Sequence, residues 1–260
     1  MEVKINMMSG LSLQNNFDLC YPILEKDLFG VCNKINSTLD NRVSIYELRI
    51  DYLLNNGINI NDIIIGINDL IKCFPNKKFI VTIRTKSEGG VIELSLDEYF
   101  TYIKMILTEL NATYVDVEYK YYILGIDSFN TLIESAKSKV ILSKHVFDNK
   151  FSRSKCEKII NKLIEGKGSI VKLATMVSTK DELFSFMNIA KKNASELKIN
   201  NKDAIFIAMG AMGRLSRVYP EYTNTRIVFI NAYDKSNTLG QYSLNTYIEY
   251  RELLAKLGKN

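Results

Sequence analysis

The chain contains 260 residues, of which 47% are hydrophobic, and carries a formal net charge of +5 at pH 7. This length supports one large core, and no Pro/Gly/Ser-rich linker or internal repeat divides it, so we expect a single domain over residues 1–260. The basic residues are spread along the chain and do not alternate with exposed aromatic residues, which argues against nucleic-acid binding. No apolar segment is long enough to span a bilayer and the N-terminus lacks the apolar core of a signal peptide, so the sequence predicts a soluble, cytoplasmic protein.

The cysteines indicate a reducing compartment rather than a disulfide or zinc framework. They form no CxxC pair, and the chain's single histidine cannot complete a zinc site. We therefore expect no bound metal, and free thiols at Cys20, Cys32, Cys73 and Cys156.

Short apolar segments recur along the chain with helix-compatible segments between them. Eight such segments, at a spacing of roughly 25 to 35 residues, predict an α/β fold of the (β/α)8 type, a single TIM barrel. A doubly wound open sheet is the alternative, but it usually has a glycine-rich first turn, which this sequence lacks. The expected strands are Leu19–Ile23, Ile45–Ile50, Phe79–Ile83, Tyr114–Glu118, Val140–Ser143, Ile170–Ala174, Ala204–Ala208 and Ile227–Ile230.

A closing helix is expected after the last strand. Its apolar residues recur at helical spacing and should form a stripe that packs on the barrel. These residues are Leu244, Tyr247, Ile248, Leu254 and Leu257.

Two residues in apolar segments have side chains suited to carbonyl chemistry. Lys172 lies within the apolar run 169–174, where a strand buried on both faces would remove water from the ammonium and favour the neutral, nucleophilic amine. His145, the only histidine, follows the apolar run 139–143 and could transfer protons. The alternatives are that Lys172 passes through the core and ends in water, and that His145 is structural.

Other charged residues lie at or near the ends of the expected strands. In a barrel these ends converge on one mouth, where active sites are found. The alternative is that Glu47, Arg49, Asp116 and Glu118 form a buried ion-pair network that only supports the barrel. We expect an orienting role of that kind, in part, for Asp116 and Glu118. The full set of charged residues is Glu47, Arg49, Asp51, Arg84, Glu88, Asp116 and Glu118.

Seven segments in this order resemble the type I 3-dehydroquinate dehydratases of the shikimate pathway, which supplies aromatic amino acid biosynthesis. They extend from the second expected strand to the closing helix. The segments are 47–51, 82–90, 116–118, 143–147, 171–174, 209–217 and 240–241. The resemblance implies a hydro-lyase that converts 3-dehydroquinate to 3-dehydroshikimate by syn elimination of water through a lysine Schiff base.

The resemblance also implies a role for individual residues. Lys172 would form the Schiff base, His145 would move the proton, and Glu88 would hold the imidazole by a hydrogen bond. The imine itself acts as the electron sink, so no metal or organic cofactor is expected. The remaining matches are Glu47, Arg49 and Arg84 for the ring hydroxyls, Arg217 for the carboxylate, Met209 for the ring face, and Asn237 and Gln241 for the lid. A small-molecule substrate, a homodimer and no nucleic-acid or membrane partner are implied.

The sequence departs from the family pattern at several positions. Val146 replaces an aspartate after the histidine, and Lys150 replaces a threonine. The usual lid sequence, Ser-Ala-Pro-Gly-Gln, reads Asn-Thr-Leu-Gly-Gln at residues 237–241, so Leu239 stands in place of the proline. Two alternatives remain open. One is a Schiff-base aldolase or transaldolase with a phosphate site at Gly210 and Gly213, and the other is a catalytically weakened barrel of the same family.

Overall fold

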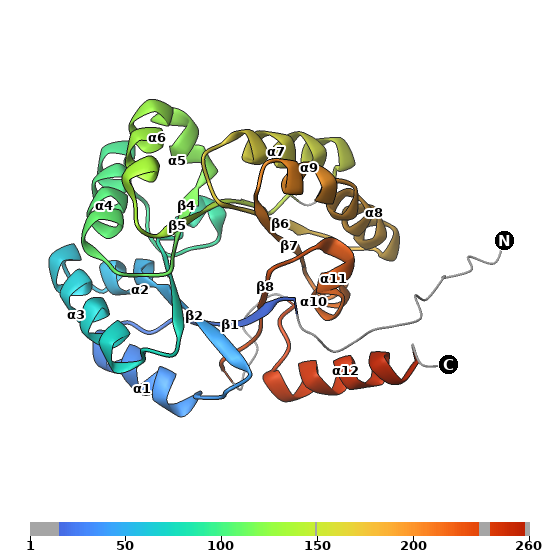
Figure 1. The fold of residues 1–260 in the computed structure, drawn as a ribbon, viewed down its shortest axis with the longest axis horizontal. Coiled ribbons are helices and arrows are strands. Elements are labelled where there is room, and N and C mark those ends of the chain that lie inside the picture. The colour runs from blue at the N-terminus through green and yellow to red at the C-terminus, as the bar shows by residue number, and fades with distance from the viewer. Residues whose placement is uncertain (1–15, 149, 234–239, 258–260) are drawn as a thin grey trace.

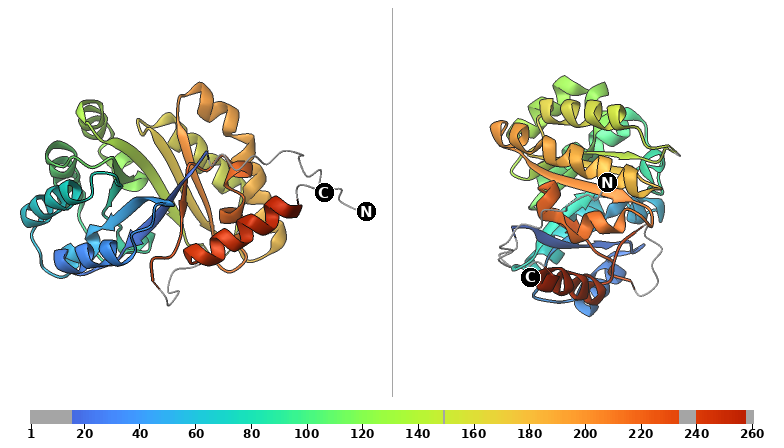
Figure 2. Two further views of the ribbon diagram at one scale, coloured as in Figure 1. Left: turned by 60° about the horizontal axis from the view of Figure 1, so that its bottom comes forward. Right: turned by 90° about the vertical axis from the view of Figure 1, so that its right-hand side faces the viewer.

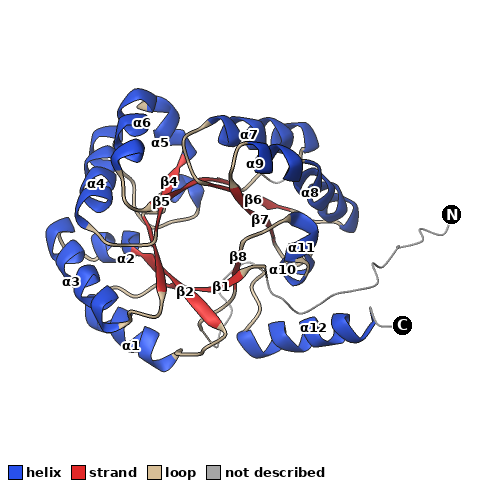
Figure 3. Ribbon diagram, in the orientation of Figure 1, coloured by secondary structure: helices blue, strands red, loops and turns tan. Residues whose placement is uncertain are grey.

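Eight parallel strands form a nearly closed barrel surrounded by helices in the computed structural model, which describes residues 16–148, 150–233 and 240–257 (Figures 1 and 3). The strand order is β7-β6-β5-β4-β3-β2-β1-β8. Each expected strand overlaps one of these, so the barrel prediction is confirmed. The strands are β1 Asp18–Ile23, β2 Val43–Arg49, β3 Lys78–Thr82, β4 Tyr114–Glu118, β5 Lys139–Val146, β6 Ile170–Met176, β7 Asp203–Met209 and β8 Ile227–Phe229.

The barrel closes where the first and last strands meet. β1 pairs in parallel with both β2 and β8. An isolated parallel β-bridge between Ala204 on β7 and Thr225, just before β8, links these two strands. The Arg226 N–H donates to Ala204 O at 2.7 Å beside it. This sequential, closed order rules out the open-sheet alternative.

Helices cover the outside of the strands and are amphipathic. In α3, Ile60, Ile63, Ile64 and Ile67 are buried at the spacing of one helical face, and the Asn59 side chain accepts the Asp62 N–H at its N-terminus. The helices are α1 Leu28–Ser37, α2 Ile50–Asn55, α3 Ile60–Cys73, η1 Lys86–Glu88, α4 Leu96–Glu109, α5 Tyr119–Leu124, α6 Ile126–Ser135, α7 Arg153–Glu165, α8 Lys180–Lys192, α9 Ala194–Ile199, α10 Arg214–Val218, α11 Pro220–Thr223 and α12 Leu244–Leu257. In the part of the chain that the structure describes, none of these helices is long and apolar enough to cross a membrane.

Alternation along the strands decides which side chains enter the barrel. On β6, Ile170 and Ala174 belong to the inner apolar cluster, whereas Val171 and Leu173 pack in the outer layer between strands and helices. Lys172 shares the parity of Ile170, so its side chain points inward. By the same rule Ile141, which is in the inner cluster, places His145 on the inner side of β5.

The closing helix forms as expected but packs differently at its C-terminal end. Leu244 and Tyr247 are buried, whereas Leu257 is 50% exposed, so the predicted stripe does not extend that far. The buried residue one turn after Tyr247 is Arg251, which donates to Val218 O at 2.9 Å and pairs with Glu221. Polar contacts with α10 and α11 therefore dock this half of α12, which lies on the outside of the barrel in Figure 2.

Candidate active site

A cavity of about 710 Å³ lies at the mouth of the barrel, where the carboxyl ends of the strands meet. Asp51, Glu88, Asp116 and Glu118 are not among the residues that line this cavity, and Asn237 falls outside the described residues. The other expected site residues all line it: Glu47, Arg49, Arg84, His145, Lys172, Met209, Arg217 and Gln241.

Lys172 ends inside this cavity and not in bulk water. The residue is 2% exposed, and its Nζ lies 3.0 Å from Asp116 Oδ2, 3.3 Å from Glu47 Oε1 and 4.6 Å from the centre of the Phe229 ring. The two carboxylates therefore place negative charge directly beside the amine. The same carboxylates are close enough to accept the proton that the amine must lose before it can attack a carbonyl.

His145 lies one inward position nearer the mouth than Lys172. Ser143 is paired with Lys172 across β5 and β6, and His145 is paired with Ala174. Burial, and then the positive charges of Arg84, Lys172 and Arg49, hold the pKa of the His145 imidazole well below its usual 6.5. The ring is therefore neutral at pH 7, and its Nε2 has no hydrogen-bond partner within the described residues. A neutral imidazole with a free nitrogen can accept a proton from a ligand.

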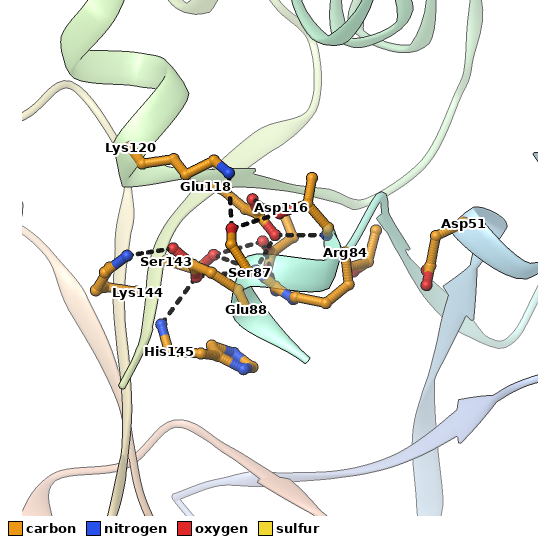
Figure 4. Close-up of polar contacts among 12 residues, drawn as sticks. Asp51, Arg84, Ser87, Glu88, Asp116, Glu118, Lys120, Ser143, Lys144 and His145 are labelled. Carbon is orange, nitrogen blue, oxygen red and sulfur yellow. Dashed lines mark hydrogen bonds and ion pairs between the residues drawn. The ribbon is translucent and has the colours of Figure 1, made fainter. Parts of the chain in front are cut away.

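Glu88 contacts the backbone of His145, whereas the sequence led us to expect contact with its ring (Figure 4). One carboxylate oxygen accepts the His145 N–H at 2.9 Å, and the other accepts from Lys144 Nζ at 2.6 Å. Gly89, at φ 85°, turns the chain directly after η1, and a Cβ there would lie 2.5 Å from the Phe147 ring. This close packing of η1 on the end of β5 places the Glu88 carboxylate against the strand backbone.

Arg84 is the centre of a buried ion-pair network. It is 2% exposed, and its guanidinium lies 2.8 Å from Asp116, 3.2 Å from Glu118 and 3.1 Å from Ser143 Oγ. Burial lowers the pKa of Arg84, but the carboxylates, Asp116 first, outweigh it and raise the pKa. Asp116 and Glu118 therefore take part in a supporting ion-pair network, as expected, and its cation is Arg84.

The same network sets the charge of its two acids. Burial alone would raise the pKa of Asp116, but Arg84 and Lys172 outweigh it and the pKa is lowered. At Glu118 burial prevails and the pKa is raised, although the Thr85 N–H and hydroxyl donate to this carboxylate at 2.9 and 2.7 Å. Asp116, in contact with Lys172, therefore remains the ionised partner of the amine.

Arg49 and Arg217 place guanidinium groups on the cavity wall. Arg49 makes two hydrogen bonds of 2.8 Å with Asp51. Arg217, on α10, donates to Ala208 O at 3.1 Å, and burial lowers its pKa to about 10, so it is charged at pH 7. Gly240 packs on this arginine at φ 80°, where a Cβ would lie 3.1 Å from Arg217 Nη1 and 2.5 Å from Gly210 O. Only glycine fits there, and it sets Gln241 at the cavity wall.

Several lining residues were not found from the sequence. Asn231 and Tyr233 follow β8 directly, so the strand-end argument that found Glu47, Arg49 and Arg84 could have found them. Lys34 could not be found in this way, because it lies on the outer helix α1 and reaches the cavity over the Tyr233 ring at 4.0 Å. The other lining residues outside the expected set are Pro22, Leu24, Tyr52, Gly89, Phe147, Ala174, Ile207 and Phe229.

The fold and the site define the class of (β/α)8-barrel proteins that hold a buried lysine beside a neutral histidine at the barrel mouth. The family model for Type I 3-dehydroquinase matches residues 19–257, and the chain therefore belongs to this family.

Known proteins of this family are similar to the chain over most of its length. A 3-dehydroquinate dehydratase from Streptococcus suis is 30% identical over 212 residues, which are 81% of this chain and 87% of the relative. A 3-dehydroquinate dehydratase from Methanocaldococcus jannaschii is 27% identical over 241 residues, 91% of this chain and 98% of that protein. The fold is similar to the crystal structure of the type I enzyme from Clostridium difficile, with a TM-score of 0.82 at 24% identity over 92% of this chain and 93% of that one.

Proposed function

We infer that this protein is a 3-dehydroquinate dehydratase, a hydro-lyase that converts 3-dehydroquinate to 3-dehydroshikimate by syn elimination through a lysine imine. The observation that carries this inference is that Lys172 and His145 face one cavity in a chain that belongs to the type I family over residues 19–257. Membership of that family favours dehydration over the aldolase alternative.

The proposed reaction assigns one covalent step to Lys172. The amine first gives one proton to Asp116 or Glu47 and attacks the ring ketone. That proton then leaves with the ketone oxygen as water, and the C=N bond forms as a protonated imine. His145 then takes a proton from the adjacent ring carbon, and the electron pair of that C–H bond moves into the imine to give an enamine. The enamine expels the ring hydroxyl, which leaves as water with the proton from His145, and hydrolysis of the imine releases the product.

The remaining cavity residues are proposed to bind the substrate. Arg217, a planar and charged guanidinium, suits a two-point grip on the substrate carboxylate. Arg49 and Glu47 offer a donor and an acceptor for ring hydroxyls, and Arg84 reaches the same wall from within its ion-pair network. We assign the ring face to Met209 and further polar contacts to Gln241 and Asn237.

The proposal extends to the setting of the enzyme. Free thiols at all four cysteines fit a reducing compartment, and we place the protein in the cytoplasm, in the shikimate pathway, as a homodimer. Analytical ultracentrifugation of the purified protein tests the dimer.

Borohydride reduction in the presence of 3-dehydroquinate tests the function. Intact mass should show one added ligand, and peptide mapping should locate it at Lys172. Among the residues that the structure describes, Lys34 is the other lysine that lines the cavity. Lys34→Met is therefore the matched control and should keep the adduct, while Lys172→Ala should lose it. An adduct on any other lysine, or no adduct and no dehydration, would refute the assignment.

A further inference from the structure

Asn231 lies on the cavity wall but has no role in the reaction described above. It follows the end of β8 by two residues, and Ile227 and Phe229, which share its parity, belong to the inner apolar cluster, so its side chain points into the barrel. The residue is 7% exposed and lines the cavity. The ring of Phe229, one inward position below, is centred 4.6 Å from Lys172 Nζ, so Asn231 borders the space that a ligand attached to this lysine would occupy.

The orientation of the Asn231 amide is fixed by its neighbours. Its Oδ1 accepts the Tyr233 N–H at 3.0 Å, and because a backbone N–H can bond only to the amide oxygen, the Nδ2 donor is left for another partner. Tyr233 is itself held, since its hydroxyl accepts the Leu24 N–H at 2.7 Å and donates to Glu25 Oε1 at 3.2 Å. Within the described part of the chain no acceptor bonds to Asn231 Nδ2, so this group can donate to a ligand.

Asn231 lies on the same side of the cavity as Arg217 and Gln241. The Asn231 N–H donates to Tyr242 O at 2.7 Å, beside an isolated parallel bridge that Asn231 also forms, so the backbone that follows Gln241 runs along the end of β8. Gly240, the residue before Gln241, packs on the Arg217 guanidinium. A neutral donor and a charged guanidinium therefore face the cavity from the β7 and β8 side.

This side of the cavity suits an anion. The only acid among the described lining residues is Glu47, which lies on β2, so no described carboxylate competes for the donors at the end of β8. In the proposed reaction the departing hydroxyl faces His145 on β5, and β6 and β7 separate β5 from β8 in the barrel (Figure 3). The carboxylate of 3-dehydroquinate is on the same tetrahedral carbon as this hydroxyl, so it points away from His145, toward Arg217 and Asn231.

We propose that Asn231 is a further substrate-binding residue, whose Nδ2 donates a hydrogen bond to the substrate carboxylate beside the Arg217 guanidinium. This inference rests on the proposed function, which supplies a ring ketone that carries a carboxylate. Because the carboxylate stays on the ring and keeps its charge throughout the reaction, Asn231 binds the substrate, the transition state and the product alike. Its loss should therefore raise KM and leave kcat almost unchanged.

Asn231→Asp tests the donor directly, because it changes the chemistry of the side chain and keeps its shape. The aspartate can still accept the Tyr233 N–H, but it turns a negative oxygen toward the substrate carboxylate in place of a donor. We expect KM for 3-dehydroquinate to rise by about tenfold in Asn231→Ala and by about 100-fold in Asn231→Asp, with kcat changed by less than about twofold. The Ki of 3-dehydroshikimate as a product inhibitor should rise by the same factors, because the product keeps the carboxylate.

Asn130→Asp is the matched control for the change of amide to acid. Asn130 lies on α6 and is not among the residues that line the cavity, and its Oδ1 likewise accepts from a tyrosine, the Tyr122 hydroxyl, at 2.7 Å. This variant should leave KM and Ki as in the wild type.

A ring ketone without a carboxylate separates binding of the anion from any effect on the amine. Cyclohexanone has no group for Asn231 to bind, so borohydride should trap it on Lys172 with the same yield in the wild type and in Asn231→Ala. Peptide mapping measures this yield at Lys172 alone.

The proposal is overturned by an unchanged KM in Asn231→Asp, by an equal rise in Asn130→Asp, or by a loss of the cyclohexanone adduct in Asn231→Ala as large as its loss of affinity for 3-dehydroquinate. Each of these results leaves turnover and the 3-dehydroquinate adduct of the wild type in place, so the role of Asn231 fails while the dehydratase assignment stands. A wild type that shows neither turnover nor adduct refutes the proposed function and this inference with it.

Discussion

The two ends of the barrel interior differ sharply although the same strands form them. Toward the amino end, the inner positions are filled by an apolar layer, and on β2 to β6 the inner position two residues further along the strand is polar. The pairs are Ile45 and Glu47 on β2, Ile80 and Thr82 on β3, Tyr114 and Asp116 on β4, Ile141 and Ser143 on β5, and Ile170 and Lys172 on β6. One step of the strand repeat thus separates the layer that stabilises the barrel from the layer that holds charge.

The difference has a physical cause. A charge buried in the barrel is costly unless other groups compensate it, and the polar layer supplies that compensation by side-chain contacts across neighbouring strands. Thr82 donates to Glu47 at 2.9 Å and Ser143 donates to Asp116 at 2.6 Å, so even the neutral members of the layer orient acids. The apolar layer below has no such requirement and only needs to fill space.

Substitutions in the two layers of β6 should separate activity from stability most strongly. We expect Lys172→Ala to abolish turnover, because it removes the amine that forms the imine. Ile170→Ala, one inner position below, should lower the free energy of unfolding by about 2 to 5 kcal/mol, as a cavity in a packed core does, but retain adduct formation in the folded protein. Steady-state kinetics with urea unfolding measures both, and loss of imine formation in folded Ile170→Ala would contradict the division into layers.

Substitution of His145 should separate imine formation, which continues, from proton transfer, which is lost. His145→Gln leaves Lys172 in place, so the adduct should still form under borohydride, whereas kcat should fall by roughly 10² to 10⁴-fold because the general base is missing. Mass spectrometry and an assay of product formation check the two steps. Turnover close to that of the wild type would assign the base to another residue.

A smaller effect is expected at the carboxylate-binding wall. Arg217→Lys should raise KM by about tenfold, because an ammonium cannot reproduce the two-point contact of a guanidinium and one charge-assisted hydrogen bond is lost. Arg214→Lys is the matched control, since Arg214 is exposed on the same helix and packs over Tyr242 at 5.7 Å. Equal KM values for the two variants would show that another group holds the carboxylate.

The smallest expected effect is on the pH dependence of stability. The pKa of His145 is well below 6.5 in the folded protein, so below pH 6.5 the unfolded chain binds a proton that the folded chain does not. The contribution of this residue is therefore constant above pH 6.5 and is lost as the pH falls below it, at no more than about 1.4 kcal/mol per pH unit. Urea unfolding at several pH values should show a shallower loss for His145→Gln, and identical slopes would mean that the ring ionises freely in the folded state.

Much of the fold and part of the site could be predicted from sequence because they depend on local patterns. Apolar runs with a fixed spacing located every strand, and the parity of Lys172 with Ile170, and of His145 with Ile141, determined that both side chains enter the barrel. The rule that strand ends converge then brought Glu47, Arg49 and Arg84 to the same mouth, whereas Met209 and Arg217 came from the family resemblance.

The tertiary structure decided which side chains touch. The family resemblance implied a contact of Glu88 with the imidazole, but the turn at Gly89 places the Glu88 carboxylate on the backbone of His145 and against Lys144. Similarly, the apolar stripe of α12 is interrupted at Arg251. This arginine is buried because α10 presents the Val218 carbonyl to it and α11 presents the Glu221 carboxylate. Strand period and residue polarity are properties of neighbouring residues in the chain, whereas ion pairs join residues far apart in sequence, and a few ångströms in how two elements pack decide which pair forms.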